Sequence, residues 1–117
     1  MSEHSEVAVR PVEAFEAPYY AAVFTAIPTE DRSGYSETNA RMEDLVKDVP
    51  GFLGADHAQT PGGLSITVAY FRDADALTEW RSNAEHRAAQ ERGRAEWYQR
   101  YTLHVAKVER SHGFKRE

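Results

Sequence analysis

The amino-acid sequence predicts one α+β domain whose elements follow the order strand–helix–strand–strand–helix–strand. Two observations support this prediction. The spacing of apolar residues changes several times along the chain, between the continuous or alternating runs of strands and the spacing of three or four residues found in helices. Proline and glycine stand where these patterns change, as they do at turns. The length of 117 residues, 41% hydrophobic and 28% charged, suits one globular domain.

The composition excludes several kinds of function. The chain has no cysteine, so disulfides, thiol nucleophiles and cysteine-ligated zinc are ruled out. Its 14 basic and 19 acidic residues give a net charge of −5, which argues against binding to the negative backbone of nucleic acid. No apolar stretch approaches the ~20 residues of a membrane span, and the first six residues do not resemble a signal peptide. We therefore expect a cytoplasmic protein that binds neither nucleic acid nor membranes.

The first elements are an arm, a strand and a helix. Residues 1–18 are acidic and contain two prolines, which predicts an extended N-terminal arm. Within it Val7, Val9 and Val12 alternate, as residues of a docked strand do, so we expect the arm to clasp a partner. Residues 19–27 form a continuous apolar run typical of a strand covered on both faces.

A helix is predicted from Ser33, which is suited to be its N-cap, to the stop at Pro50-Gly51. One face of this helix carries Tyr35, Thr38, Met42, Leu45, Val46 and Val49.

The second half of the chain predicts a hairpin, a broken helix and a last strand. Residues 52–59 and 64–71 are strands joined by the turn at Pro61-Gly62-Gly63. Residues 73–99 are helical, and the phase of their apolar pattern shifts near Asn83, which indicates two pieces. Residues 101–109 form the last strand, and residues 111–117 a short tail.

This order of elements is the split, ferredoxin-like arrangement, a four-stranded antiparallel sheet with helices on one face. The predicted strands carry apolar side chains on both faces, yet one layer of helices covers only one face. A second copy of the same sheet is the simplest cover for the other face, so we expect a homodimer of a domain spanning residues 19–110.

Several segments resemble the antibiotic biosynthesis monooxygenase family. They are residues 19–25 (YYAAVFT), residues 50–54 (PGFLG), the Asp73-x-x-Ala76-Leu77-x-x-Trp80 segment and the Glu85-His86 pair. The resemblance implies a dimeric α+β barrel, in which two ferredoxin-like sheets close on each other. The family includes quinone-forming monooxygenases without cofactor, haem-degrading enzymes and members without an assigned activity.

Two polar residues near the helix break are candidate catalytic groups. His86 is placed to face a cavity between helices and sheet, where a neutral imidazole accepts a proton near pH 7. The alternative is a structural histidine that caps the helix or bonds a carbonyl. Asn83 is a candidate to hold a substrate oxyanion, with helix capping as its alternative.

Aromatic residues of the second half predict a site for a flat ligand. Trp80, Trp97, Tyr70, Tyr98 and Tyr101 are candidates to line it, and the alternative for both tryptophans is a place in the core. Gln90, one turn after His86, is a candidate to contact the ligand. Gly93 on the inward stripe of the helix is expected to make room for a ligand or a bulky neighbour.

No pair of residues has the spacing of a metal site, because neither His57 nor His104 has a second ligand nearby, and no phosphate-binding glycine motif occurs. We therefore expect neither a metal nor a nucleotide cofactor.

The resemblance implies oxidation of a planar phenolic substrate without flavin or metal. In that mechanism His86 takes the phenolic proton, Asn83 holds the oxyanion, and Trp80 and Trp97 sandwich the ring. Haem binding or degradation is an alternative. Haem-degrading members carry an Asn on the first strand and an axial His ten residues after the Trp, where this chain has Thr25 and Gln90, so His86 would have to bind haem instead. A further alternative is a dimeric barrel that binds a ligand without turnover.

Overall fold

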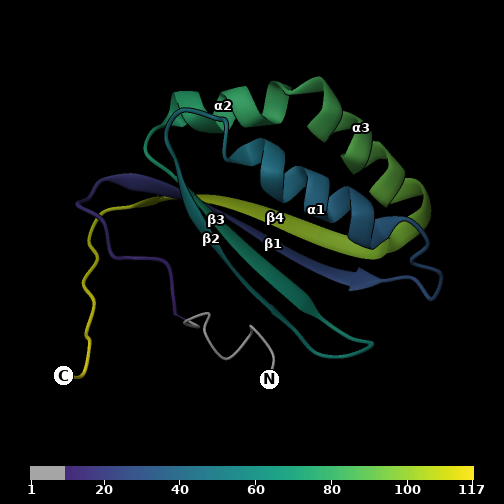
Figure 1. Cartoon of the computed structure of the whole chain (residues 1–117), viewed down its shortest axis with the longest axis horizontal. Coiled ribbons are helices and arrows are strands. Elements are labelled where there is room, and N and C mark those ends of the chain that lie inside the picture. The colour runs from purple at the N-terminus through teal and green to yellow at the C-terminus, as the bar shows by residue number, and fades with distance from the viewer. Residues whose placement is uncertain (1–9) are drawn as a thin grey trace, which may run out of the picture.

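The computed structural model describes residues 10–117 as one sheet covered on one side by helices (Figure 1). In chain order the elements are β1 (Tyr19–Pro28), α1 (Tyr35–Val46), β2 (Phe52–Gln59), β3 (Ser65–Phe71), α2 (Ala74–Ser82), α3 (Ala84–Arg92), the π-helical turn η2 (Gly93–Trp97) and β4 (Tyr98–Val108). The sheet is antiparallel with strand order β2-β3-β1-β4. The predicted ferredoxin-like fold is thereby confirmed.

The core lies where α1 and α2 meet the sheet at the β1–β3 pair. Val46 at the end of α1 and Val49 just after it pack with Ala76 and Leu77 of α2 around Phe71, whose side chain is fully buried. Tyr20, Ala22, Phe52, Ala69 and Trp80 complete the cluster. Burial of these apolar side chains is the main force that holds the helical layer on the sheet.

The predicted helix boundaries differ from the structure at both ends of α1 and at the end of the last helix. α1 ends at Val46, before the predicted stop at Pro50-Gly51. Ser33 is not the N-cap of α1, because its hydroxyl and its amide both donate to the Asp31 carboxylate. Gly34 takes the cap position instead with a φ of 83°, which only a residue without a side chain adopts easily. The last helix ends at Trp97 and not at Gln99, since the amide of Tyr98 donates to the Gly93 carbonyl and β4 begins there at once.

The face of the sheet away from the helices carries the described part of the arm, which in turn contacts the C-terminal tail. The Val12 amide donates to the Asp56 carboxylate over 2.8 Å, and its side chain lies against Gly54. The hydroxyl of Ser111 donates to the carbonyl of Phe15, so the arm and the tail run side by side. Val7 and Val9 lie outside the described residues, and the expected clasp and the domain boundaries remain predictions.

No helix within residues 10–117 has both the length and the apolar character needed to cross a membrane.

Candidate functional site

A cavity of about 270 Å³ lies between the helical layer and the sheet. Its floor is formed by β1, β3 and β4, with Ala22, Thr67 and Ala69 among the lining residues. Its roof is formed by α1, α2 and α3, and its end by η2 and the start of β4. Small side chains meet in the middle of this floor, where Ala22 pairs with Ala69, and they leave space open beneath the helices.

His86 and Trp80 form the polar end of the roof. The imidazole of His86 stacks on the indole of Trp80 with ring centroids 4.0 Å apart and planes inclined by 15°. Its Nδ1 lies 3.0 Å from the Trp80 carbonyl oxygen. A carbonyl only accepts hydrogen bonds, so Nδ1 carries the proton and Nε2 keeps its lone pair. Burial lowers the pKa of His86 below its usual value, against a smaller opposing effect of this hydrogen bond, so the ring is neutral near pH 7.

Asn83 is the N-cap of α3 and not a wall of the cavity. Its side-chain oxygen accepts a hydrogen bond from the His86 amide over 2.9 Å, and it is absent from the lining residues. Its backbone amide donates to the same Trp80 carbonyl that holds the imidazole. The structure thus shows the alternative role, a helix cap, and gives no support to the expected role in holding an oxyanion, because the side chain does not line the cavity. The cap fixes the first turn of α3, which sets the position of His86.

Loss of this cap is expected to cost stability. Asn83→Ala should lower the free energy of unfolding by about 1 kcal/mol, because the His86 amide loses its acceptor. Asn83→Asp, which caps as well, should retain the stability of the parent. Urea unfolding of both variants measures the difference, and equal losses would show that the side-chain oxygen is not what matters here.

Trp97 closes one end of the cavity from a buried position. Its ring is 2% exposed, and its Nε1 donates to the Ser33 carbonyl over 2.9 Å. One edge-on contact joins it to Tyr35 at 5.4 Å between centroids, and the guanidinium of Arg92 lies 4.7 Å from its centroid. Trp97 is thus a lining residue and a core residue at once. Since Trp80 already stacks on His86, the expected sandwich of a ligand between the two indoles is not preformed.

Gly93 makes room for Tyr98. A methyl group on Gly93 would lie 2.5 Å from a ring carbon of Tyr98, closer than any real contact. Of the two predicted occupants of the space at Gly93, a ligand or a bulky neighbouring side chain, the structure shows the second, Tyr98. Burial, with a further contribution from the neighbouring Tyr35, raises the pKa of Tyr98 well above its usual value, so its hydroxyl stays protonated.

Tyr101 and Gln90 line the cavity as the sequence predicts. The hydroxyl of Tyr101 accepts a hydrogen bond from Arg94 over 3.2 Å, and its ring lies 4.9 Å from that of Phe24. Phe24 and Tyr35 are further lining residues that are not among the predicted ones. Tyr35 had a signal in the sequence, because it lies on the apolar face of its helix.

Tyr70 does not reach the cavity. It pairs with Ala21 in the register of β1 and β3, whereas the neighbouring Ala69 and Phe71 line the cavity. Successive residues of a strand point to opposite faces, so Tyr70 lies on the face away from the helices, where its ring contacts Tyr19. Its expected place in a helix–sheet cavity is wrong.

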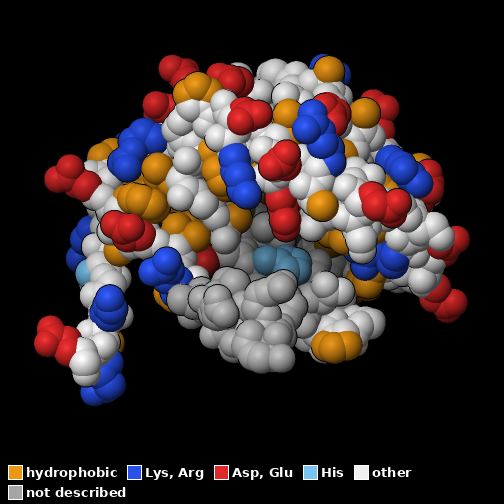
Figure 2. All heavy atoms as spheres, in the orientation of Figure 1, with side chains coloured by type: hydrophobic (Ala, Val, Ile, Leu, Met, Phe, Trp, Pro, Cys, Tyr) orange, Lys and Arg blue, Asp and Glu red, His pale blue; other side chains and the backbone are white. Residues whose placement is uncertain are grey.

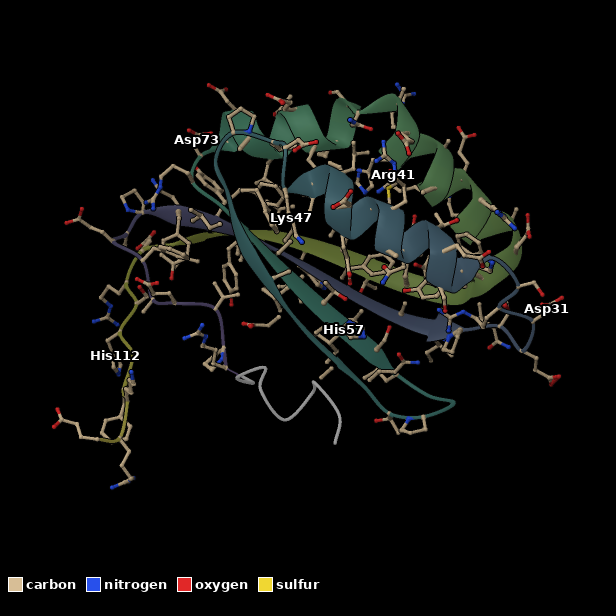
Figure 3. The ribbon with its side chains drawn as sticks, viewed as in Figure 1. Asp31, Arg41, Lys47, His57, Asp73 and His112 are labelled. Carbon is tan, nitrogen blue, oxygen red and sulfur yellow. The ribbon has the colours of Figure 1, made fainter. Side chains whose placement is uncertain are left out.

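Thr67 and His57 form a polar pair that the sequence does not predict. The two residues face each other across β2 and β3, and His57 Nδ1 lies 2.8 Å from the Thr67 hydroxyl oxygen. Figure 3 places His57 in the sheet below α1, and its side chain is exposed; Figure 2 shows pale-blue histidine atoms below the helical layer in the same view. Among residues 10–117 no group of three His, Asp or Glu side chains is arranged to hold a metal ion.

Comparisons with known proteins give one matching family and a related sequence. A family model described as antibiotic biosynthesis monooxygenase matches residues 18–92. The uncharacterised protein YqjZ of Bacillus subtilis (strain 168) is 45% identical over 100 residues, which span 86% of this chain and 88% of that protein.

Two solved structures show the same fold. A mutant of SnoaB, a cofactor-independent oxygenase from Streptomyces nogalater, superposes with a TM-score of 0.69 at 13% identity, over 81% of this chain and 97% of that one. Rv0793 from Mycobacterium tuberculosis gives a TM-score of 0.66 at 18% identity, over 85% of this chain and all of that one. Because the matched family model covers residues 18–92, more than half of the chain, the chain belongs to the antibiotic biosynthesis monooxygenase family.

Proposed function

We propose that this protein is a cofactor-independent oxygenase of planar phenolic substrates, with His86 as its general base. The observation that carries the proposal is the fixed tautomer of His86. Its Nδ1–H is held by the Trp80 carbonyl, so Nε2 is left as the basic atom of a neutral imidazole that lines an aromatic cavity. A cavity with aromatic walls and a few polar groups suits a flat ring system bearing hydroxyls. The solved relative SnoaB is described as a cofactor-independent oxygenase, which is consistent with this proposal.

In the proposed reaction His86 Nε2 takes a proton from the bound phenol. The resulting anion is electron-rich and reacts with O₂ directly, so the substrate itself supplies the electrons. Asn83 does not line the cavity, so it is not the group that we propose to hold the anion. Gln90 lines the cavity one turn after His86 and carries an amide N–H₂ group, which makes it the better donor to the oxyanion.

The size of the cavity favours a compact ring system over haem. Small-molecule sites usually enclose about 300–1,000 Å³. The cavity here holds about 270 Å³, just below that range, and one face of Trp80 is already occupied by His86. We therefore place oxidation of a phenol ahead of haem binding.

Oxygen uptake tests the proposal against its alternatives. With anthrone as substrate, the protein should consume O₂ and form anthraquinone without added flavin or metal. Titration with haemin should give no Soret band typical of a histidine-ligated haem. A Soret band without oxygen uptake would favour haem binding, and ligand binding without either signal would favour a barrel that only binds.

We also propose that the protein works as a homodimer, because the face of the sheet away from the helices keeps apolar side chains accessible. Ile27 and Ile66 are 37% and 39% exposed there. Val68→Asp, in the middle of this face, should convert a dimer to a monomer in light scattering at micromolar concentration, since a buried charge lacks a partner. Glu37→Lys on the exposed face of α1 serves as control and should leave the dimer intact. A parent protein that is already monomeric would contradict the proposal.

A further inference from the structure

The wall of the cavity carries a positive charge that is not balanced by an acid. Arg81, in the last turn of α2, is a lining residue, and no Asp or Glu of residues 10–117 is among the others. Arg81 is also exposed, so it lies where the cavity meets solvent. The opening of the cavity is therefore positive at this point, although the chain as a whole has a net charge of −5.

The guanidinium of Arg81 has no protein partner within residues 10–117, where it takes part in neither a hydrogen bond nor an ion pair. Arg92 and Arg94, in contrast, each contact a neighbouring side chain. The acid four residues after Arg81 is Glu85, and two contacts of 2.6 and 3.0 Å bind it to Arg41, which Figure 3 labels on α1. The N–H donors of Arg81 thus remain for water or a ligand.

Arg81 belongs to the same part of the wall as the proposed base. It follows Trp80 directly in α2, and the Trp80 indole stacks on His86 with 4.0 Å between ring centroids. All three residues line the cavity. Because an arginine side chain is long and flexible, a ligand whose hydroxyl meets His86 can present a second group to Arg81.

A guanidinium at the opening of an aromatic chamber selects ligands by their charge. It binds a planar carboxylate through two parallel N–H···O bonds, a geometry that a neutral ester does not match. It repels an ammonium group, and the described cavity wall offers no carboxylate to bind one. The aromatic walls contact the ring of the ligand whatever its charge, so the charged substituent decides between otherwise similar ligands.

We propose that Arg81 determines the specificity of the site by binding a carboxylate of the substrate, so that the substrate class is a hydroxylated aromatic carboxylic acid. The inference rests on the proposed function in one respect, namely that the ligand is a phenol. It assigns the phenolic hydroxyl to His86 and the carboxylate to Arg81, on either side of Trp80 in the sequence.

Calorimetric titration at pH 7 with two matched probes tests the proposal. The probes are 6-hydroxy-2-naphthoic acid, which is ionised at this pH, and its methyl ester, which has the same ring and hydroxyl but no charge. The parent protein should bind the acid about fivefold more tightly than the ester. This ratio is at the upper end for an ion pair that water reaches, because the guanidinium is exposed.

Arg81→Gln should abolish this preference by weakening the binding of the acid and leaving the affinity for the ester unchanged. Arg81→Lys keeps the charge but loses the paired N–H donors, so it should retain part of the preference. Arg87→Gln is the matched control. Arg87 is exposed on α3 and does not line the cavity, so its loss should leave both affinities as in the parent.

Four results would overturn the assignment of Arg81. They are a parent protein that binds neither probe, a parent that binds both equally, a preference that persists in Arg81→Gln, and an equal loss of affinity for both probes in that variant. The last result would mean that Arg81 contacts the phenolic oxygen and not a carboxylate.

Two further comparisons separate this inference from a structural role and from the proposed oxidation. A cation that only stabilises the C-terminal end of α2 would lower the melting temperature of Arg81→Gln and leave the preference unchanged, which would also overturn the inference. A protein that prefers the acid through Arg81 but consumes no O₂ would retain the carboxylate site and lose the oxygenase function.

Discussion

His86→Asn is expected to lower the rate of oxygen uptake by about 10²–10⁴-fold, the usual effect of losing a general base. The asparagine amide N–H₂ group lies near the position of Nδ1 and can still donate to the Trp80 carbonyl, which now accepts from His86. The variant therefore removes the basic Nε2 and keeps the structural hydrogen bond. Its melting temperature should stay close to that of the parent, and oxygen-electrode rates with anthrone measure the loss.

His86→Ala provides the contrast. It removes both the base and the bond to the carbonyl, so it should lose activity equally and also lose about 1–3 kcal/mol of stability. If folded His86→Asn has normal turnover, then His86 is not the base and its role is structural.

The rate should also depend on pH with a defined sign. Burial lowers the pKa of His86 from its ordinary value of 6.5, so the base stays neutral down to more acidic conditions. The acidic limb of the rate profile should lie below pH 6.5 and be absent in His86→Asn. The free energy of unfolding should depend on pH in the same direction as the rate. The contribution of neutral His86 to this free energy is complete above the pKa of the residue in the unfolded chain. It is lost as the pH falls toward the lower pKa in the folded protein, because the unfolded chain binds the proton more readily.

Trp97→Ala should give the largest loss of stability, about 3–5 kcal/mol, which is typical of removing a large buried aromatic ring. The indole is 2% exposed, packs edge-on against Tyr35 and donates to the Ser33 carbonyl. Its removal would leave a hole at the point where η2, α1 and β1 meet. Urea unfolding followed by circular dichroism measures the effect.

Trp97→Phe separates the contributions of packing and hydrogen bonding. This variant keeps an aromatic ring and loses the Nε1 donor, so it should cost about 1 kcal/mol for the bond to Ser33 and more for the lost ring volume, but less than alanine. An alanine variant nearly as stable as the parent would mean that Trp97 serves only as a wall for a ligand.

The fold is predictable because its signals are local. The hairpin of β2 and β3, the apolar run of β1 and the break near Asn83 each depend on a few neighbouring residues, and the structure confirms them. The errors arise where tertiary contacts decide. Ser33 has the chemistry of a helix cap, yet the Asp31 carboxylate engages it first.

The site is harder to predict, since the cavity lies where small side chains leave a volume unfilled and no sequence motif marks that volume. In β3 the larger Ile66, Val68 and Tyr70 alternate with smaller residues, and size suggests that the larger set faces the helices. The smaller set faces them instead, and Thr67 and Ala69 leave the cavity open. No pattern within one strand shows which face will be left unfilled, so the sequence places Tyr70 wrongly and does not reveal Thr67.

The way in which α3 is attached at its two ends determines the position of His86. This helix buries none of its residues, and it is held at its start by the Asn83 cap and at its end by the buried Gly93 and Trp97 of η2. Because His86 stands in its first turn, a displacement of α3 away from the sheet would also separate the imidazole from the indole and from the carbonyl of Trp80. The placement of this one helix therefore sets both the height of the cavity roof and the hydrogen bond that fixes the tautomer of the proposed base.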